Sequence, residues 1–433
     1  MRISYCSLGC KVNLYESEAI VNKFLDNGFE LVEFPNEADV CIINTCTVTQ
    51  TSDSKSRKII RKAISHSPNA VNCVMGCYSQ LNNKDVCDIP GVSIVTGTSE
   101  RDKIYDLAVK KLKEKNFECV DLTQSYYDIN CYENLSLNRF NDRTRGFNEV
   151  QDGCENFCSY CTIPYSRGKL RSRDKDAIIT EIATLTKEGM REVVLTGINT
   201  GAYGKESNIC SFPKLIDEIC NKVENLGRIR ISSIEATEIN DELLEVLKKN
   251  SKHICMHLHV PLQGGCDKTL KNMNRKYDTK YIKEKITKIR SYFPDINITT
   301  DFLAGFSGET EEDFQDAFNF VSEMEFGEMH VFPYSPRIRT EAYKYPNRVS
   351  DAIKKFRVNM LLSLNKVNAL KYREKFRNKV VDCLVEKNEN GICFGHSSNY
   401  LEISFKSNTV KENDFVKVVI TDVNYPVCTG ELV

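Results

Sequence analysis

Short apolar runs alternate with amphipathic segments along the first 110 residues of the chain. Four of the runs are short enough to be buried strands and lie at residues 2–8, 39–43, 70–75 and 92–95. Residues 16–25 and 54–64, which lie between them, repeat their apolar side chains at helical spacing. Strands separated by helices pair in parallel, so residues 1–112 are expected to form an α/β domain with a doubly wound parallel sheet.

The alternation of strand and helix repeats six times in the middle of the chain. The strand candidates are residues 147–151, 192–196, 228–232, 256–261, 297–303 and 329–332. The helical patterns between them lie at residues 175–188, 213–223, 241–249, 279–292 and 311–323. Such a repeat is typical of a parallel barrel, whose functional site lies at the carboxyl ends of its strands. We therefore expect residues 140–370 to form a partial (β/α)6 barrel, which a polar, tyrosine-rich linker at residues 123–148 joins to the first domain.

The pattern changes near residue 377 to short β runs with turn residues between them. These runs lie at residues 380–385, 392–394, 401–405 and 415–421. Their spacing predicts a small C-terminal β-barrel over residues 373–433. Residues 351–379, just before it, have helical spacing, nine lysines and arginines, and an apolar stripe that includes Leu361, Leu362 and Val367.

The composition is that of an ordinary globular protein. Of the 433 residues, 41 % are hydrophobic and 27 % are charged, which is enough apolar material to bury the cores of roughly two or three domains. The net charge is −1, so any affinity for nucleic acid must come from local basic patches. The N-terminus has no signal pattern and no apolar run is long enough to cross a membrane, so we expect a cytoplasmic protein without a membrane partner.

Three cysteines, Cys154, Cys158 and Cys161, lie within eight residues of each other. A zinc site would need a fourth ligand at comparable spacing, but the next cysteine along the chain is Cys210. Three thiolates can hold a four-iron cube that keeps one iron open to another ligand. The alternative is a set of three thiols without a metal.

A second set of cysteines follows the predicted strands of the first domain. Its members are Cys10, Cys46 and Cys77. The carboxyl ends of parallel strands form the edge at which such sheets bind ligands, so these thiols predict a second three-cysteine cluster. The strands themselves contain Cys6, Cys41 and Cys73, and a free cysteine inside a strand usually packs as a small apolar side chain. In a reducing cytosol, the 19 cysteines are better explained as metal ligands or buried groups than as disulfides.

Basic runs follow two of these cysteines. Residues 55–62 come soon after Cys46, and residues 167–173 come soon after Cys161. Together with the basic helix at residues 351–379, they favour an anionic polymer such as RNA as the partner. The alternatives are that the helix has only a solvated charged face and that one or two of the other cations balance the charge of the clusters.

The run Cys154-Glu-Asn-Phe-Cys158-Ser-Tyr-Cys161 resembles the signature of radical S-adenosylmethionine enzymes. In that family the open iron binds S-adenosylmethionine, and one electron from the cluster cleaves it to a 5′-deoxyadenosyl radical. The resemblance implies an electron donor and places the cofactor at the ends of the later strands. The residues it implies there are Gly197, Ser233, Glu235 and Gln263.

Over essentially its full length, the chain resembles the methylthiotransferases, a family that joins a cluster domain, a radical S-adenosylmethionine core and a TRAM barrel. Gly9-Cys10-Lys11-Val12-Asn13 resembles the branch that acts on N6-threonylcarbamoyladenosine (t6A) in tRNA. The isopentenyladenosine branch typically reads Gly-Cys-Gln-Met-Asn at this position, and the ribosomal-protein branch typically reads Gly-Cys-Pro-Lys-Asn. The chain departs from the family where Gly264-Gly265-Cys266 replaces Ser-Gly-Ser, where Ser307 replaces proline, and where Arg339 replaces a glycine.

The resemblance implies a reaction at adenosine 37 in the anticodon loop. The radical removes the hydrogen at C2 of the adenine, and the cluster held by Cys10, Cys46 and Cys77 supplies sulfur that a second S-adenosylmethionine has methylated. The expected product is 2-methylthio-N6-threonylcarbamoyladenosine (ms2t6A), made by a monomer with two [4Fe-4S] clusters. Lys11 can meet the carboxylate of the threonylcarbamoyl group or balance cluster charge. The alternatives are methylthiolation of isopentenyladenosine in tRNA or of a ribosomal-protein aspartate, and a non-catalytic iron–sulfur RNA-binding sensor.

Overall fold

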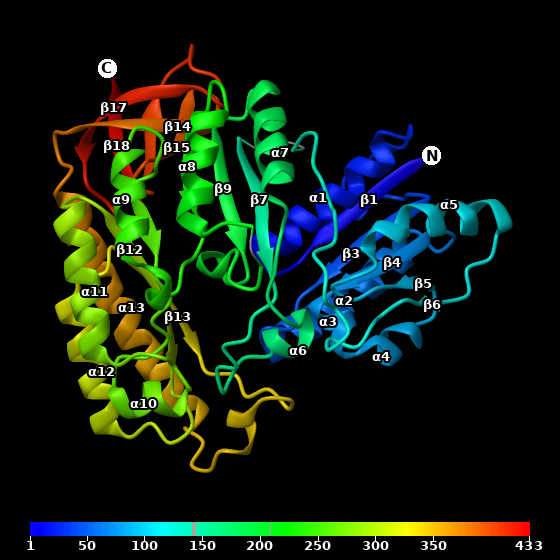
Figure 1. Ribbon diagram of the computed structural model, residues 1–433, viewed down its shortest axis with the longest axis horizontal. Helices are drawn as coiled ribbons and strands as arrows, with labels where there is room; N and C mark the ends of the chain where they lie inside the picture. Colours follow the sequence, from blue (N-terminus) through cyan, green and yellow to red (C-terminus); the bar gives the residue numbers. More distant parts are fainter. Residues whose placement is uncertain (141–143, 208) are drawn as a thin grey trace.

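The computed structural model describes residues 1–140, 144–207 and 209–433 (Figure 1). Residues 141–143 of the predicted linker, and residue 208, lie outside the described residues. Figure 1 shows the N-terminal sheet beside the central strands and the C-terminal strands at one end of them. No helix in the described part of the chain combines the length and the apolar character that crossing a membrane requires.

The N-terminal domain is a parallel sheet with the strand order β2-β1-β3-β4-β5-β6. Its strands are β1 (Arg2–Ser7), β2 (Glu30–Leu31), β3 (Val40–Thr45), β4 (Val71–Gly76), β5 (Val92–Val95) and β6 (Val120–Asp121). Its helices are α1 (Lys11–Leu25), α2 (Gln50–His66), α3 (Cys77–Leu81), α4 (Asn83–Cys87), η1 (Arg101–Lys103) and α5 (Ile104–Glu114). Apolar side chains of α1 and α5 pack on one face and those of α2 and α4 on the other, so the predicted doubly wound sheet is confirmed. Strands β2 and β6 were not predicted because two residues are too few to form a pattern.

The central region consists of six parallel strands in two sheets. These are β7 (Arg145–Asp152), β9 (Glu192–Gly197) and β10 (Arg228–Ile231) in one sheet, and β11 (His257–His259), β12 (Asn297–Ala304) and β13 (Glu328–Pro333) in the other. The short strand β8 (Arg171–Ser172) runs antiparallel along the edge of β7. A bridge between Ile229 and Ile254 links the two sheets, which gives the predicted partial barrel.

Helices cover the outside of the partial barrel. They are α7 (Lys175–Lys187), α8 (Phe212–Lys222), α9 (Asp241–Lys249), α11 (Thr279–Tyr292) and α12 (Glu311–Met324). The short helices α6 (Ile163–Arg167), η2 (Thr200–Ala202), η3 (Ala236–Glu238), α10 (Asp267–Asn272) and η4 (Glu341–Lys344) lie in the connections between these elements. Alternation along the strands separates the two faces of the wall: Leu258, Phe302 and Met329 pack in the core with the helices. Their neighbours His259, Asp301 and His330 therefore face the interior of the barrel.

The C-terminal barrel is closed, with the strand order β14-β15-β16-β18-β17. Its strands are β14 (Val380–Glu389), β15 (Ile392–Ser397), β16 (Glu402–Lys406), β17 (Phe415–Asp422) and β18 (Val427–Leu432). The turn between β15 and β16 lies against the amino ends of the central strands. Arg230 donates hydrogen bonds to the carbonyls of Ser397 and Ser398, and Asn297 donates one to the carbonyl of Asn399. The small barrel thus closes the end of the partial barrel that is remote from the cysteine loops.

The long helix α13 (Asp351–Glu374) corrects two sequence expectations. Its predicted apolar stripe is partly wrong, because Leu361 is buried but Leu362 and Val367 are 45 % and 62 % exposed. The buried face is largely polar: Arg357 pairs with Glu309 at 2.6 Å, and Asn365 accepts a hydrogen bond from the backbone of β13. Such contacts are made with residues far away in the sequence, so helical periodicity does not predict them.

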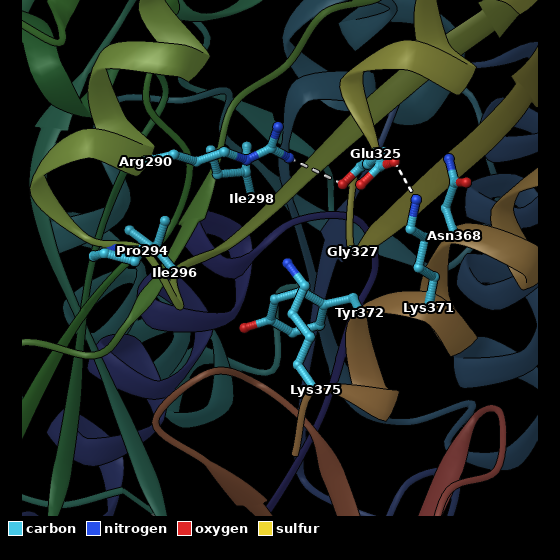
Figure 2. Close-up of a pocket in the computed structure, with 10 residues that line it drawn as sticks. All are labelled: Arg290, Pro294, Ile296, Ile298, Glu325, Gly327, Asn368, Lys371, Tyr372 and Lys375. Carbon is cyan, nitrogen blue, oxygen red and sulfur yellow. Dashed lines mark hydrogen bonds and ion pairs between the residues drawn. The ribbon is translucent and has the colours of Figure 1, made fainter. Parts of the chain in front are cut away.

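The end of α13 is only in part the basic surface that the sequence suggested, since Lys375 and Lys379 are exposed but Arg373 is not. Arg373 is buried and pairs with Glu328, so this residue was wrongly expected to contact phosphate. Lys371 pairs with Glu325 beside a cavity that Arg290 and Lys375 also line (Figure 2). The cavity measures about 10 Å³, which is room for no more than one water molecule.

A buried carboxylate beneath the C-terminal barrel gives a first prediction. Glu192 on β9 accepts hydrogen bonds from Arg228 at 2.5 Å and from Arg230 at 2.7 Å. Burial alone would raise the pKa of Glu192, but Arg230 and Arg228 outweigh it and lower this pKa to about 2. The contribution of the Glu192 carboxylate to the free energy of unfolding is therefore fully present above the unfolded pKa of about 4.5 and is lost as the pH falls through about 2.

Glu192→Gln should leave two buried arginines without their carboxylate and lower the free energy of unfolding by about 3–5 kcal/mol at pH 7. Urea titration of the apoprotein measures this loss. The pH dependence supplies the control, since the difference between variant and wild type should shrink between about pH 4.5 and pH 2. If the difference in the free energy of unfolding between variant and wild type were the same at about pH 4.5 and about pH 2, Glu192 would not be the ionised partner of the two arginines.

Candidate functional site

The structure brings the loops of Cys10, Cys46 and Cys77 together at one edge of the N-terminal sheet. They follow β1, β3 and β4, and the strand order changes direction between β1 and β3. Such a switch point opens a crevice at the carboxyl ends of the strands, where α/β sheets bind ligands. A Cβ atom on Gly9 would lie 3.0 Å from the sulfur of Cys46, so this thiol lies against the loop that carries Cys10.

Two glycines fix the positions of these thiols. Gly9 and Gly76 both have φ near +102°, a conformation that strains any residue with a side chain. A Cβ atom on Gly76 would also lie 2.2 Å from the side-chain oxygen of Asn44. Each glycine is followed directly by a cysteine at a helix start: Cys10 is the N-cap residue of α1, and Cys77 is the first residue of α3. The exposed backbone amides of a helix start favour the thiolate form that a metal ligand requires.

The second triad lies on the loop between β7 and α6. The backbone amide of Cys161 donates to the carbonyl of Cys158 at 2.9 Å, and the amide of Cys154 donates to the carbonyl of Gly168 at 3.1 Å. Ser159, between the cysteines, donates to the carbonyl of Asn272 through its hydroxyl and accepts a bond from the amide of Ala342. The loop is therefore held from three directions at the carboxyl end of the partial barrel.

The spacing of the thiols fits a cluster better than a single ion. Among the described residues, two groups have three ligand atoms within 4.8 Å of one another: His259 with Asp301 and His330, and Glu16 with Glu149 and Asp152. Neither thiol triad is this compact. Around one zinc ion, with Zn–S bonds of about 2.3 Å, the sulfurs would lie about 4 Å apart. In a four-iron cube each thiolate binds a different iron, so three converging but separated sulfurs are what a cube needs.

Each triad has an arginine against one of its thiols. Arg275 donates to the sulfur of Cys158 at 3.3 Å, and Arg167 donates to the sulfur of Cys77 at 3.3 Å. Burial raises the pKa of Cys154 to about 12 and also raises the pKa of Cys77. A guanidinium opposes this effect, because it stabilises the thiolates that must form when metal binds.

Arg167 also joins the two domains. It is fully buried, and its guanidinium donates to Glu16 at 2.5 Å, to Asp152 at 3.1 Å and to Asn13 at 2.7 Å. Arg101 pairs with the same carboxylate of Glu16. Although burial alone would raise the pKa of Glu16, these two arginines hold it below its ordinary value. The ion pairs thus lie directly beneath the thiol of Cys77.

The basic run that follows Cys161 was therefore wrongly expected to face RNA. Arg167, Arg171 and Arg173 are all buried, and Arg171 and Arg173 pair with Asp152 and Glu181 at 2.7 Å each. Their partners lie on other elements of the fold, which a sequence pattern does not reveal. The run after Cys46 is different: its cations Lys55, Lys58, Arg61 and Lys62 are exposed on α2.

The four residues expected near S-adenosylmethionine all lie at the carboxyl ends of β9, β10 and β11. Glu235 accepts a hydrogen bond from Arg275 at 2.5 Å, and Ser233 is half-buried beside it in sequence. Gln263 has φ near +70°, and its amide donates to the carbonyl of Asp301 at 2.8 Å. A Cβ atom on Gly197 would lie 2.9 Å from a carbonyl of β7, so strand packing already explains this glycine.

Arg275, which links Glu235 to Cys158, was missed by the sequence reasoning. It follows the short helix α10 in a polar segment, where a single arginine usually lies on the surface. Nothing in its neighbourhood distinguishes it from Lys276, and only the folded structure shows that it is buried at the cluster loop.

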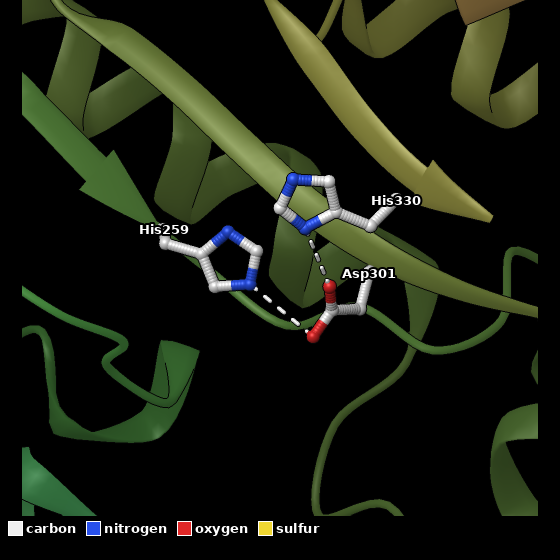
Figure 3. A group of neighbouring side chains, drawn as sticks. All are labelled: His259, Asp301 and His330. Carbon is white, nitrogen blue, oxygen red and sulfur yellow. Dashed lines mark hydrogen bonds and ion pairs between the residues drawn. The ribbon is translucent and has the colours of Figure 1, made fainter. Parts of the chain in front are cut away.

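Lys11 projects from the start of α1 into the partial barrel. Its ammonium lies 3.5 Å from the hydroxyl of Ser232 at the end of β10. Burial, with Arg145 and Arg230 nearby, lowers the pKa of Lys11 to about 8. The same interior contains His259, Asp301 and His330 from three neighbouring strands (Figure 3). The polar side chains of the barrel interior therefore begin one residue away from Cys10.

Aromatic side chains surround a surface cavity between the linker and α6. The cavity measures about 320 Å³, and its lining includes Tyr126, Tyr165 and Arg339. Nearby, Tyr127 is 64 % exposed and packs at a tilt of 33° against Tyr126, and Phe157 of the cluster loop is 46 % exposed. Exposed rings beside cations are the features on which single-stranded nucleotides stack.

Two family models match the chain. Residues 148–321 match the Radical SAM superfamily, and residues 2–97 match the Uncharacterized protein family UPF0004. Among solved structures, the radical S-adenosylmethionine methyltransferase TsrM from Kitasatospora setae shares the fold. It superposes with a TM-score of 0.58 and 13 % identity over 77 % of this chain and 74 % of that one.

Curated relatives are similar over nearly the whole chain. The threonylcarbamoyladenosine tRNA methylthiotransferase MtaB of Bacillus subtilis (strain 168) is 40 % identical over 100 % of this chain and 96 % of its own length. The protein of the same name from Aquifex aeolicus (strain VF5) is 33 % identical over 93 % of this chain and 96 % of its own length. The tRNA-2-methylthio-N(6)-dimethylallyladenosine synthase of Thermoanaerobacter sp. (strain X514) is 34 % identical over 87 % of this chain and 80 % of its own length.

Proposed function

The chain belongs to the methylthiotransferase family of radical S-adenosylmethionine enzymes, and on this basis we propose that it converts t6A at position 37 of tRNA into ms2t6A. The observation that carries the proposal is the pair of separate thiol triads, each with its own arginine, at the facing carboxyl edges of two parallel-stranded domains. Methylthiolation needs two chemistries, radical formation and sulfur donation, and two triads supply a place for each.

In this proposal, Cys154, Cys158 and Cys161 hold the [4Fe-4S] cluster of the radical reaction. With S-adenosylmethionine bound, that cluster supplies an electron for the cleavage that yields a radical able to remove the hydrogen at C2 of adenine. This C–H bond is too weakly acidic for any protein base. Arg275 donates hydrogen bonds to the sulfur of Cys158 and to the carboxylate of Glu235, and we assign to Glu235 the role of acceptor for a ribose hydroxyl of the cofactor.

We assign a second [4Fe-4S] cluster, and with it sulfur donation, to Cys10, Cys46 and Cys77. The buried Arg167 supports this assignment, because a cation is retained beside Cys77 although burying it is costly. Arg167 is held by Glu16 and Asp152, so it fixes this edge of the sheet against the loop of the first cluster. The target base then has to lie between the two triads.

The proposed substrate is a tRNA anticodon loop that binds across the mouth of this space. The exposed cations on α2 suit its phosphates, and Tyr127 and Phe157 suit its unstacked bases. The choice of t6A over isopentenyladenosine rests on two observations. The relatives that carry the t6A name include one 40 % identical to this chain, and the interior next to Cys10 is polar and cationic.

The experiment compares two substrates under anaerobic conditions. Purified enzyme with reconstituted clusters, a reductant and S-adenosylmethionine is incubated with tRNA that bears either t6A or isopentenyladenosine, and the nucleosides are identified by mass spectrometry. We expect ms2t6A from the first tRNA and no methylthio product from the second. A product only from the isopentenyl tRNA would contradict the substrate assignment, and 5′-deoxyadenosine formation would exclude a non-catalytic sensor.

A further inference from the structure

The interior of the partial barrel holds a hydrogen-bonded triad that neither set of thiols uses. Asp301 lies between two histidines: its carboxylate oxygens are 3.2 Å from Nε2 of His259 and 3.1 Å from Nδ1 of His330 (Figure 3). Thr299 in turn contacts Nδ1 of His259 at 2.9 Å. The two rings stack with their centroids 5.4 Å apart. One carboxylate thus orients two imidazoles that face the space inside the barrel.

His330 is the accessible member of the triad. Its side chain is 53 % exposed, whereas that of His259 is 12 % exposed. Because Nδ1 is bound to Asp301, Nε2 is the nitrogen that a ligand can reach. The hydrogen bond with Asp301 raises the pKa of His330, so the doubly protonated ring is favoured more than in a free histidine. A protonated imidazole that a carboxylate holds in place in this way can donate a hydrogen bond from Nε2 to an anion.

Lys11 is the second cation of this space. Its ammonium contacts the hydroxyl of Ser232 at 3.5 Å, and two residues further on the amide of Ile234 donates to the carbonyl of His259 at 2.9 Å, so Lys11 lies over the strand next to the triad. Within the described part of the chain, Lys11 forms no ion pair with a carboxylate. By contrast, its neighbours Arg145 and Arg230 are paired with Glu386 and Glu192. Among the interior groups that the structure describes, the ammonium of Lys11 and the Nε2 of His330, whose Nδ1 is bound to Asp301, are therefore available to an incoming anion.

Building on the proposed function, we propose that Lys11 and His330 form a carboxylate-binding subsite that holds the threonyl carboxylate of t6A, with Asp301 and His259 as positioning residues for His330. Lys11 follows Cys10 directly, so a carboxylate bound here keeps the attached adenine next to the sulfur-donating triad. A neutral isopentenyl group gains nothing from two cations and leaves them without a partner, which makes the subsite selective against it.

The test compares two anticodon stem-loops, one with t6A at position 37 and one with the methyl ester of t6A. Esterification removes the negative charge of the threonyl carboxylate and adds only a methyl group. Wild-type enzyme should prefer the acid through a KM that is about 10–100-fold lower. In Lys11→Met and His330→Phe this preference should fall at least about 10-fold for each variant. Lys280→Met, on the exposed outside of α11, is the matched control and should keep the wild-type preference.

The possible outcomes distinguish a failure of the proposed subsite from a failure of the proposed function. If wild-type enzyme does not modify t6A at all, the proposed function fails. If it modifies t6A but treats acid and ester alike, or if both variants keep the preference, the subsite is wrong and the function stands. Two histidines and a carboxylate are also the donor set of a mononuclear iron site. Loss of one iron from His330→Phe would assign the triad to a metal and overturn the carboxylate subsite.

Discussion

Cys154→Ala should abolish the cleavage of S-adenosylmethionine to 5′-deoxyadenosine while the protein keeps about four of its roughly eight irons. The reason is that the two thiol triads lie on separate loops of separate domains, each with its own arginine. Loss of one ligand set therefore leaves the other intact. Iron analysis and chromatography of the reaction products, both after anaerobic reconstitution, measure the two quantities.

Cys46→Ala should give the complementary result. It should also retain about four irons and continue to produce 5′-deoxyadenosine, but it should form no methylthio product. Cys73→Ala is the matched control, since Cys73 is fully buried within β4 and should leave all of the iron in place. Equal loss of cleavage in Cys154→Ala and Cys46→Ala would refute the division of labour. Loss of a cluster in Cys73→Ala would show that the wrong cysteines had been assigned.

Arg167→Met should be among the most destabilising single substitutions in the chain. It removes one of the two arginines that pair with each of two buried carboxylates, Glu16 and Asp152, and the cation beside the thiol of Cys77. Arg101, which also pairs with Glu133, and Arg171 then no longer balance the buried negative charge. An uncompensated buried charge costs about 3–5 kcal/mol. Urea unfolding of the apoprotein, followed by circular dichroism, should therefore show the first transition at markedly lower urea than in the wild type.

Two further variants test whether the loss of the ion pairs causes the loss of stability in Arg167→Met. Lys169→Met, only two residues away, removes an exposed cation and should change stability by less than about 0.5 kcal/mol. Adding Glu16→Gln to Arg167→Met removes one negative charge from the cluster that has lost a cation, while Arg101 keeps its pair with Glu133, and should recover part of the lost stability. If Arg167→Met were as stable as Lys169→Met, the ion pairs beneath Cys77 would have no structural role.

The strands, and the loops that carry the cysteines, could be predicted from the sequence because they rest on local rules. Short apolar runs become buried strands, and ligands gather where parallel strands end, so these rules alone place Cys10, Cys46 and Cys77 at one edge of the sheet. The same rules predicted the closed C-terminal barrel but missed β18, whose residues Val427–Leu432 alternate too weakly to form a pattern.

The charged partners could not be predicted, because the sequence does not show which carboxylate meets which arginine. Arg167 and Glu16 are 151 positions apart in the chain, and Arg275 and Glu235 are 40 apart. A basic run looks the same whether its cations are solvated, as on α2, or buried in ion pairs, as at Arg171 and Arg173. Charge patterns therefore suggested an RNA surface in three places. Burial contradicts this for three of the four cations at residues 167–173 and for three of the nine at residues 351–379.

The position of the C-terminal barrel was also beyond the reach of the sequence. Its turn at residues 397–400 lies against the amino ends of the central strands, where Arg230 and Asn297 hold it by backbone carbonyls. Contacts to backbone carbonyls place no demand on side-chain type in the turn. The small barrel covers the amino end of the partial barrel, so in the proposed reaction the target base enters from the opposite end, where the cysteine loops lie.

The most direct test of the proposed reaction is the nucleoside composition of tRNA from cells that lack this chain. Liquid chromatography with mass spectrometry should show that ms2t6A has disappeared and that t6A has accumulated in its place. The wild-type chain should restore ms2t6A, and Cys154→Ala should not. Unchanged ms2t6A, together with loss of the methylthio derivative of isopentenyladenosine, would contradict the proposal that t6A is the substrate.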